Sequence, residues 1–128
     1  MSVAAYWMIA IVGILQLKHF ICDFPLQTNY MAQNKGAYGH PGGLYHAALH
    51  GIGSVPAALI AGVAALPAVL IIVVEMVVHY HLDWAKSRVG ASMELTPRDH
   101  GFWIAFGLDQ GLHHATYLAM AVLFFSFS

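Results

Sequence analysis

Histidine and aspartate occur in pairs four residues apart at four places in this sequence. The pairs are His19/Asp23, His46/His50, His79/Asp83 and Asp109/His113. In an α-helix, two residues at this spacing lie one turn apart on the same face, so both members of a pair point the same way. Imidazole nitrogens and carboxylate oxygens are common ligands of zinc and other divalent metals. The spacing therefore predicts four pairs of metal ligands on four helical faces.

The third pair belongs to a stretch with further ionisable side chains, EMVVHYHLDWAK at residues 75–86. Glu75 precedes His79 by one turn and Lys86 follows Asp83 by three residues, so both share the helical face of the pair. Ionisable groups in an apolar helix usually face a bundle interior and have a function. We predict Glu75 as a proton acceptor, with a metal ligand or a hydrogen-bond partner of His79 as alternatives. Lys86 would hold an anionic substrate or a developing oxyanion, unless it only extends to lipid headgroups.

The composition indicates an all-α polytopic membrane protein. Of the 128 residues, 59% are hydrophobic and 9% are charged, whereas about 25% are charged in a soluble domain. A soluble bundle could not cover its outer surface with so few polar side chains. The formal net charge of -1 provides no basic surface for a nucleic acid. The single cysteine, Cys22, excludes an intramolecular disulfide.

The apolar runs predict a single domain, residues 1–128, with four transmembrane helices in an up-down bundle. A bilayer crossing requires about 20 residues. The predicted helices cover residues 3–24, 44–62, 67–88 and 102–127. Gly62 and Pro67 mark the tight turn between the second and third helices. The polar segments 25–43 and 89–101 are predicted to be exposed connections.

Four crossings place both polar connections on one side of the membrane. That side collects four of the five basic residues, Lys35, Lys86, Arg88 and Arg98. By the positive-inside rule this face is cytoplasmic, and both termini lie outside. We therefore expect a multi-pass protein of the bacterial inner membrane, with all four pairs in the cytoplasmic half of the bilayer.

If all four pairs face the bundle interior, their side chains converge on one site. The set exceeds what one tetrahedral zinc needs and suits two bridged divalent ions. Three aspartates against two dications leave one positive charge, which a bridging hydroxide would cancel. We predict two Zn ions, with Mn or Fe as alternatives. A single metal and a metal-free polar network remain open, because an isolated His or Asp near a helix end is more often an interfacial or capping residue.

Other polar residues near the pairs are expected to have lesser roles. Lys18 lies about 100° around the helix from His19 and is expected to point elsewhere. Gln16 is predicted to support a ligand. Gln110 and His114 form a further pair at this spacing, and whether they join the site is left open. The remaining histidines are predicted not to bind metal: His40, His81 and His100.

Three segments resemble a known family of small bacterial and phage membrane proteins, the domain of unknown function 3307. They are LQLKHFICDFPLQTNYM at 15–31, EMVVHYHLDWAKSR at 75–88 and GLDQGLHHATYL at 107–118. The resemblance covers nearly the whole chain and implies a polytopic membrane protein, but no reaction. It places the polar positions of the family on His19, Asp23, Gln27, His46, His50, His79, Asp83, Lys86, Asp109, Gln110 and His113. A looser likeness to small membrane-bound metal-dependent hydrolases, in size and in His/Asp content, favours hydrolysis by analogy.

The function that we expect is a metal-dependent hydrolase at the cytoplasmic leaflet. A metal-activated water would attack a lipid-derived phosphoester, ester or amide. A divalent-metal transporter or sensor is one alternative, and a metal-stapled structural or partner-binding protein is another. The expected partners are the lipid bilayer and a lipid or small anionic substrate. A homo-oligomer is left open.

Overall fold

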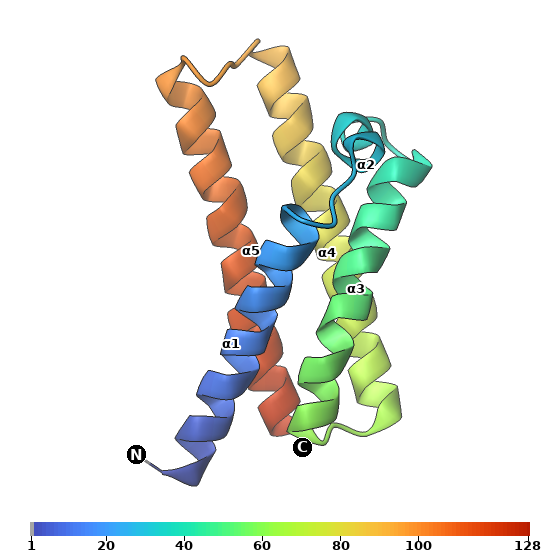
Figure 1. The fold of residues 1–128 in the computed structure, drawn as a ribbon, viewed down its shortest axis with the longest axis vertical. Helices are drawn as coiled ribbons and strands as arrows, with labels where there is room; N and C mark the ends of the chain where they lie inside the picture. Colours follow the sequence, from blue (N-terminus) through green and yellow to red (C-terminus); the bar gives the residue numbers. More distant parts are fainter. Residues whose placement is uncertain (1) are drawn as a thin grey trace.

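The computed structural model describes residues 2–128, which form five α-helices and no strand (Figure 1). The expectation of an all-α fold is therefore confirmed. The helices are α1 (Val3–Asp23), α2 (Asn29–Asn34), α3 (Pro41–Ala61), α4 (Ala65–Ser92) and α5 (His100–Ser126). The four long helices begin and end within four residues of the predicted ranges.

Local signals in the sequence account for the ends of these helices. The hydroxyl of Ser2 accepts a hydrogen bond from the Ala5 amide at 3.3 Å and caps α1. Helix α3 begins with a proline at its first position, where a missing N–H costs nothing. It ends at Gly62, whose φ of 72° lies in the left-handed region that glycine adopts freely. Only three residues separate α3 from α4, so these two helices are antiparallel neighbours.

The connection at 25–43 contains a helix that the sequence analysis did not predict. Helix α2 has six residues and is capped by Thr28, whose hydroxyl accepts from the Met31 amide at 3.3 Å. Six residues are too few to show an apolar period, so the sequence contains no pattern that predicts this helix. Its backbone packs closely on α3, because a Cβ added to Gly42 would lie 2.9 Å from the Tyr30 carbonyl oxygen.

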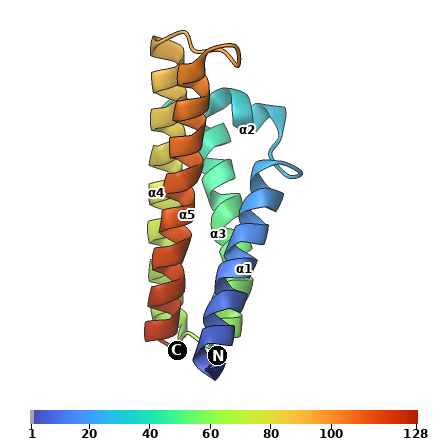
Figure 2. The same cartoon turned by 90° about the vertical axis from the view of Figure 1, so that its left-hand side faces the viewer.

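The long helices form an antiparallel bundle, in which α3 and α5 also contact each other. Helix α1 contacts α3 and α5, and α4 contacts α3 and α5. Both termini and the α3–α4 turn lie at one end, and α2 lies near the other (Figures 1 and 2). At that second end, α4 and α5 project past α1. The apolar core fills the half of the bundle nearer the termini, with Ile11, Leu15, Ala57, Ala58, Tyr117, Met120, Ala121 and Phe124 among its buried members.

Three helices among the described residues are long and apolar enough to cross a membrane: α1, α3 and α4. Their most apolar windows have mean hydropathies of 1.5, 1.3 and 1.9. Side chains such as Leu59 and Leu66, which are 74% and 71% exposed, give these helices an apolar outer surface. These features are those of a membrane protein. Helix α5 has 27 residues, but Asp109, Gln110 and His113 interrupt its apolar sequence, and it is not among the three.

Candidate metal centre

The four pairs predicted from their spacing lie in the half of the bundle nearer α2. Each long helix supplies one pair, and each pair faces the interior. The five histidines are at most 3% exposed, and Asp83 and Asp109 are each 7% exposed. The Asp23 side chain is 11% exposed, because α1 ends there. The apolar core lies below this polar cluster, towards the termini.

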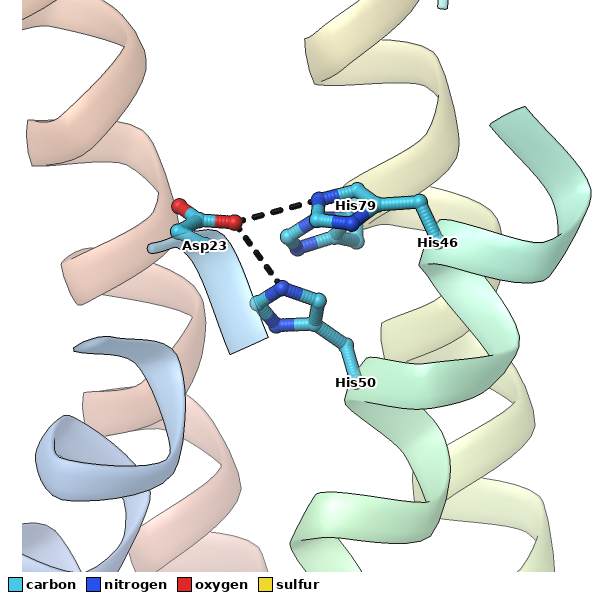
Figure 3. Close-up of side chains that lie close together, drawn as sticks. All are labelled: Asp23, His46, His50 and His79. Atoms are coloured by element: carbon cyan, nitrogen blue, oxygen red, sulfur yellow. Dashed lines mark hydrogen bonds and ion pairs between the residues drawn. The ribbon is translucent and has the colours of Figure 1, made fainter. Parts of the chain in front are cut away.

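One group of metal-binding atoms joins α1, α3 and α4. It consists of Asp23, His46, His50 and His79, whose ligand atoms all lie within 4.8 Å of one another. Asp23 Oδ1 is 3.1 Å from His46 Nε2 and 2.9 Å from His50 Nε2. Figure 3 shows the Asp23 carboxylate facing the two α3 rings across the bundle, with His79 beside them. The His50 and His79 rings are stacked, with centroids 3.7 Å apart.

A second group shares His79 with the first and adds Asp83 and His113. Asp83 Oδ2 lies 3.4 Å from His79 Nε2 and 3.3 Å from His46 Nε2. The His79 and His113 rings have centroids 4.3 Å apart. The two groups overlap at His79, so their donors form one cluster of six residues drawn from α1, α3, α4 and α5.

Several donor atoms of the cluster are buried without a hydrogen-bond partner. The Nε2 atoms of His46, His79 and His113 have none among residues 2–128. His46 Nε2 lies within 3.3 Å of oxygens of both Asp23 and Asp83, but neither contact has the alignment of a hydrogen bond. Leaving such an atom unpaired costs about 1–3 kcal/mol. A cation between the rings and the carboxylates would satisfy these lone pairs together, so the residues fit a metal centre.

Two of the eight predicted ligands lie outside both groups. His19 Nε2 is 3.0 Å from Gln110 Oε1 and 3.4 Å from Asp23 Oδ2, so its strongest contact is an amide. Asp109 Oδ1 is 3.7 Å from His113 Nδ1 and has no hydrogen-bond partner among the described residues. His19 supports the Asp23 carboxylate, and Asp109 leaves a free carboxylate oxygen at the edge of the cluster.

From its position on α1, Lys18 was expected to point away from the site. The structure instead places its side chain inside the bundle. It is 6% exposed and forms a buried ion pair with Glu75. Its stem passes beside Gly53, where an added Cβ would lie 3.4 Å from Lys18 Cδ. The long flexible stem lets the ammonium group reach across the interior, which a helical-wheel angle alone does not reveal. Ser54 Oγ donates to the other Glu75 oxygen at 2.6 Å, so this carboxylate is fully paired beneath the cluster.

Tyr117 supports the cluster and was not among the predicted site residues. Its hydroxyl oxygen is 3.0 Å from His19 Nδ1 and 3.3 Å from His50 Nδ1. Because a phenol hydroxyl can both donate and accept hydrogen bonds, it can hold the His19 and His50 rings in place. Its place one turn after His113 was the signal that could have identified it.

The two lysines at the α2 end of the bundle have different surroundings. Lys35 Nζ forms an ion pair with Asp83 Oδ2 at 2.9 Å. Lys86 Nζ lies 5.6 Å from the centre of the Phe106 ring, and within residues 2–128 no hydrogen bond or ion pair joins it to the cluster. It lines a small groove between α4 and α5, about 190 Å³ in volume, that Asp109 also lines.

The remaining polar residues lie around the site. His114 is outside both groups, with its ring 5.2 Å from that of His19. His81 is exposed and contacts Tyr38, and His40 caps α3. Gln27 donates to the Asp23 carbonyl at 2.9 Å.

Comparison with known proteins gives a family but no reaction. The family described as "Protein of unknown function (DUF3307)" matches residues 11–128. No curated protein and no solved structure matches the chain.

Proposed function

The chain belongs to this family of unknown function, and we propose from the site alone that it is a membrane-embedded metal-dependent hydrolase. Two divalent ions, zinc in the first place and Mn or Fe as alternatives, would be held by the residues of these two groups. The observation that carries the proposal is the convergence of buried, unpaired Nε2 atoms on shared aspartate oxygens. The bound ions would supply an acidified water and an electrophile.

The depth of the cluster supports a substrate at the membrane surface. Along α4, His79 and Asp83 lie about 21 Å and 27 Å from the start of the helix, at a rise of 1.5 Å per residue. The hydrocarbon core of a bilayer is about 30 Å thick. With the α3–α4 turn at one boundary and four helices crossing, the cluster would lie just inside the other boundary, next to lipid headgroups.

The charges support a cytoplasmic site in the bacterial inner membrane. Lys35, Lys86, Arg88 and Arg98 all belong to the end of the bundle that contains α2 and the α4–α5 connection. Under the positive-inside rule this end faces the cytoplasm, and the termini lie outside.

Proton transfer is better suited to Asp109 than to Glu75. Glu75 is neutralised by Lys18 and accepts from Ser54, so it has no free oxygen directed at the cluster. Asp109 keeps an unpaired oxygen beside His113 and lines the groove between α4 and α5. An acceptor in this position can take a proton from water and return it to a leaving group. Glu75 is better described as a structural partner of Lys18.

The first test is the metal content of the His79→Ala variant, because His79 belongs to both groups. Element analysis of the purified protein should find about two ions per chain in the wild type and fewer than one in the variant. Hydrolysis of bis(p-nitrophenyl) phosphate should fall with the metal. The matched control is His100→Ala, which removes an exposed histidine at the start of α5. Equal metal content in the two variants would refute the ligand assignment.

The half of the bundle nearer the termini argues against a route for metal transport. Below the Lys18–Glu75 pair the interior is closed by apolar side chains, including Leu15 and Phe124, each at most 1% exposed. An ion passing beyond that pair would lose all of its ligands in an apolar medium.

A further inference from the structure

Among the residues that the structure describes, Lys35 is the one lysine whose ammonium group contacts the cluster from the side of α2. Its Nζ is 2.9 Å from Asp83 Oδ2, and the two side chains are 14% and 10% exposed. Asp83 also lies within 3.4 Å of His46 and His79. Lys35 therefore stands between the ligand atoms and the outside, where a substrate group would arrive.

The loop that follows Lys35 is attached to α4, the helix that carries Asp83. The Gly39 amide donates to the Tyr80 hydroxyl at 2.5 Å. Tyr38 packs edge-on against Trp84, with centroids 5.3 Å apart. A Cβ on Gly36 would lie 3.3 Å from Ser87 Cβ, so the loop backbone lies directly on the helix. These contacts hold the backbone that follows the lysine in place relative to the cluster.

The charges of the cluster show what this lysine could bind. Four carboxylates lie in and around it, from Asp23, Glu75, Asp83 and Asp109. Two ammonium groups, those of Lys18 and Lys35, oppose them, which leaves two negative charges if the histidines are neutral. Two dications and one hydroxide would change this to one positive charge. An uncompensated charge is costly where water is largely excluded, so a bound monoanion would complete the site.

We propose that the substrate is a phosphodiester, whose single negative charge is held by Lys35 and the metal centre together. A neutral ester or amide would leave the positive charge uncompensated, and Lys35 would then have no partner once Asp83 is engaged by metal. The ammonium group would donate to a non-bridging phosphate oxygen, as lysine does at other phosphate sites. Lys35 acts here as a substrate-binding residue. This inference rests on the proposed function, because it counts two metal ions.

The test separates substrate binding from hydrolysis and from metal loading. The full-length protein in detergent, loaded with zinc, is titrated with dimethyl phosphate, which is monitored by ³¹P NMR. Lys35→Ala should weaken binding at least tenfold with the metal content unchanged, and Lys35→Arg should retain most of it. The control is Arg88→Ala, which removes an exposed cation of α4 and should bind as the wild type does. Equal affinities for Lys35→Ala and the wild type would overturn the proposal, as would a count of one metal per chain.

The same titration identifies the source of the phosphodiester. Tighter binding of dihexanoyl phosphatidylglycerol than of dimethyl phosphate would assign the site to a lipid headgroup, and equal binding would assign it to a soluble ester. Both outcomes support a phosphodiester.

Binding that depends on Lys35 without any turnover would refute the hydrolase proposal and leave the proposed anion site supported. Faster turnover of p-nitrophenyl acetate than of bis(p-nitrophenyl) phosphate would refute the phosphodiester and leave the hydrolase standing.

Discussion

At the scale of single residues, the side chains around the ligands matter as much as the ligands. His46 and His79 present unpaired Nε2 atoms to shared carboxylates, but both nitrogens of His19 contact neighbouring side chains. Tyr117 contacts two of the rings from below. Lys18 and Glu75 form a charge pair one turn beneath the cluster. These contacts decide which nitrogens are free to bind a metal.

Replacement of Tyr117 by phenylalanine tests this orienting role. Loss of the hydroxyl removes a partner of His19 Nδ1 and of His50 Nδ1, so metal affinity should fall about 10–100-fold. Competition titration with a zinc chelator measures the change. Tyr6→Phe, which alters an exposed tyrosine of α1, serves as the control. Unchanged affinity in Tyr117→Phe would show that the hydroxyl does not orient the rings.

Replacement of Lys18 by methionine tests the buried ion pair. Methionine matches the apolar stem of lysine but leaves the Glu75 carboxylate buried without its partner, which should cost about 3–5 kcal/mol of unfolding free energy. The double variant Lys18→Met/Glu75→Gln removes both charges and should recover most of that loss. Unfolding in mixed micelles, followed by circular dichroism, measures all three proteins. A loss in the double variant as large as that in Lys18→Met would mean that the two side chains do not interact.

At the scale of elements, α2 is the short helix whose place on α3 positions Lys35. Six residues cannot form a stable helix alone, so its place depends on contact with α3. That contact requires a glycine at 42, where the Tyr30 carbonyl oxygen lies too close for a side chain. The loop after α2 then carries Lys35 to Asp83. A shift of α2 relative to α3 should therefore displace Lys35 and change the contacts at the metal centre.

The Gly42→Ala variant tests how α2 is seated. The added methyl group would lie 2.9 Å from a backbone oxygen and 3.0 Å from Asn34 Cβ, so α2 must shift. Overpacking of this kind typically costs 1–3 kcal/mol, that is about 2 kcal/mol here. Hydrogen exchange should show faster opening of the α2 amides. In the control variant Gly107→Ala the new Cβ meets nothing within 4 Å, and exchange in α2 should be unchanged.

At the scale of the whole molecule, the cluster connects all four long helices at the end where α4 and α5 separate from α1 (Figures 1 and 2). Ligands of the two groups come from every one of these helices. Without metal, the aspartates at the cluster repel one another in an interior that screens charge poorly. A bound metal should therefore stabilise the bundle, in addition to any part that it takes in catalysis.

Chelation should lower the thermal stability of the purified protein. Metal that binds only the folded state stabilises it by about 2.7 kcal/mol at a free concentration 100 times Kd. The melting temperature should fall when EDTA is added and recover with zinc, and His79→Ala should not respond to EDTA. If hydrolysis is absent but this shift is present, the metal has a structural role and the enzyme proposal fails. An identical melt with and without EDTA would argue against bound metal altogether.

Much of this protein could be inferred before its fold was known, because the relevant rules are local. The 3.6-residue period identified which His and Asp side chains share a face, and the thickness of a bilayer predicted the approximate lengths of the helices. The ends of α1 and α3 followed from Pro25 and Gly62. The family was also identified from sequence segments, and its match confirms that assignment.

Residue types and spacing by themselves determined that the chain is helical and which pairs could bind a metal. Only the tertiary structure decided that His79 is common to two groups, that Lys18 crosses to Glu75, and that Lys35 lies over Asp83. The physical reason is distance along the chain. Helical periodicity relates residues a few positions apart, whereas contacts between α1 and α4, or between the α2 loop and α4, depend on how whole helices pack.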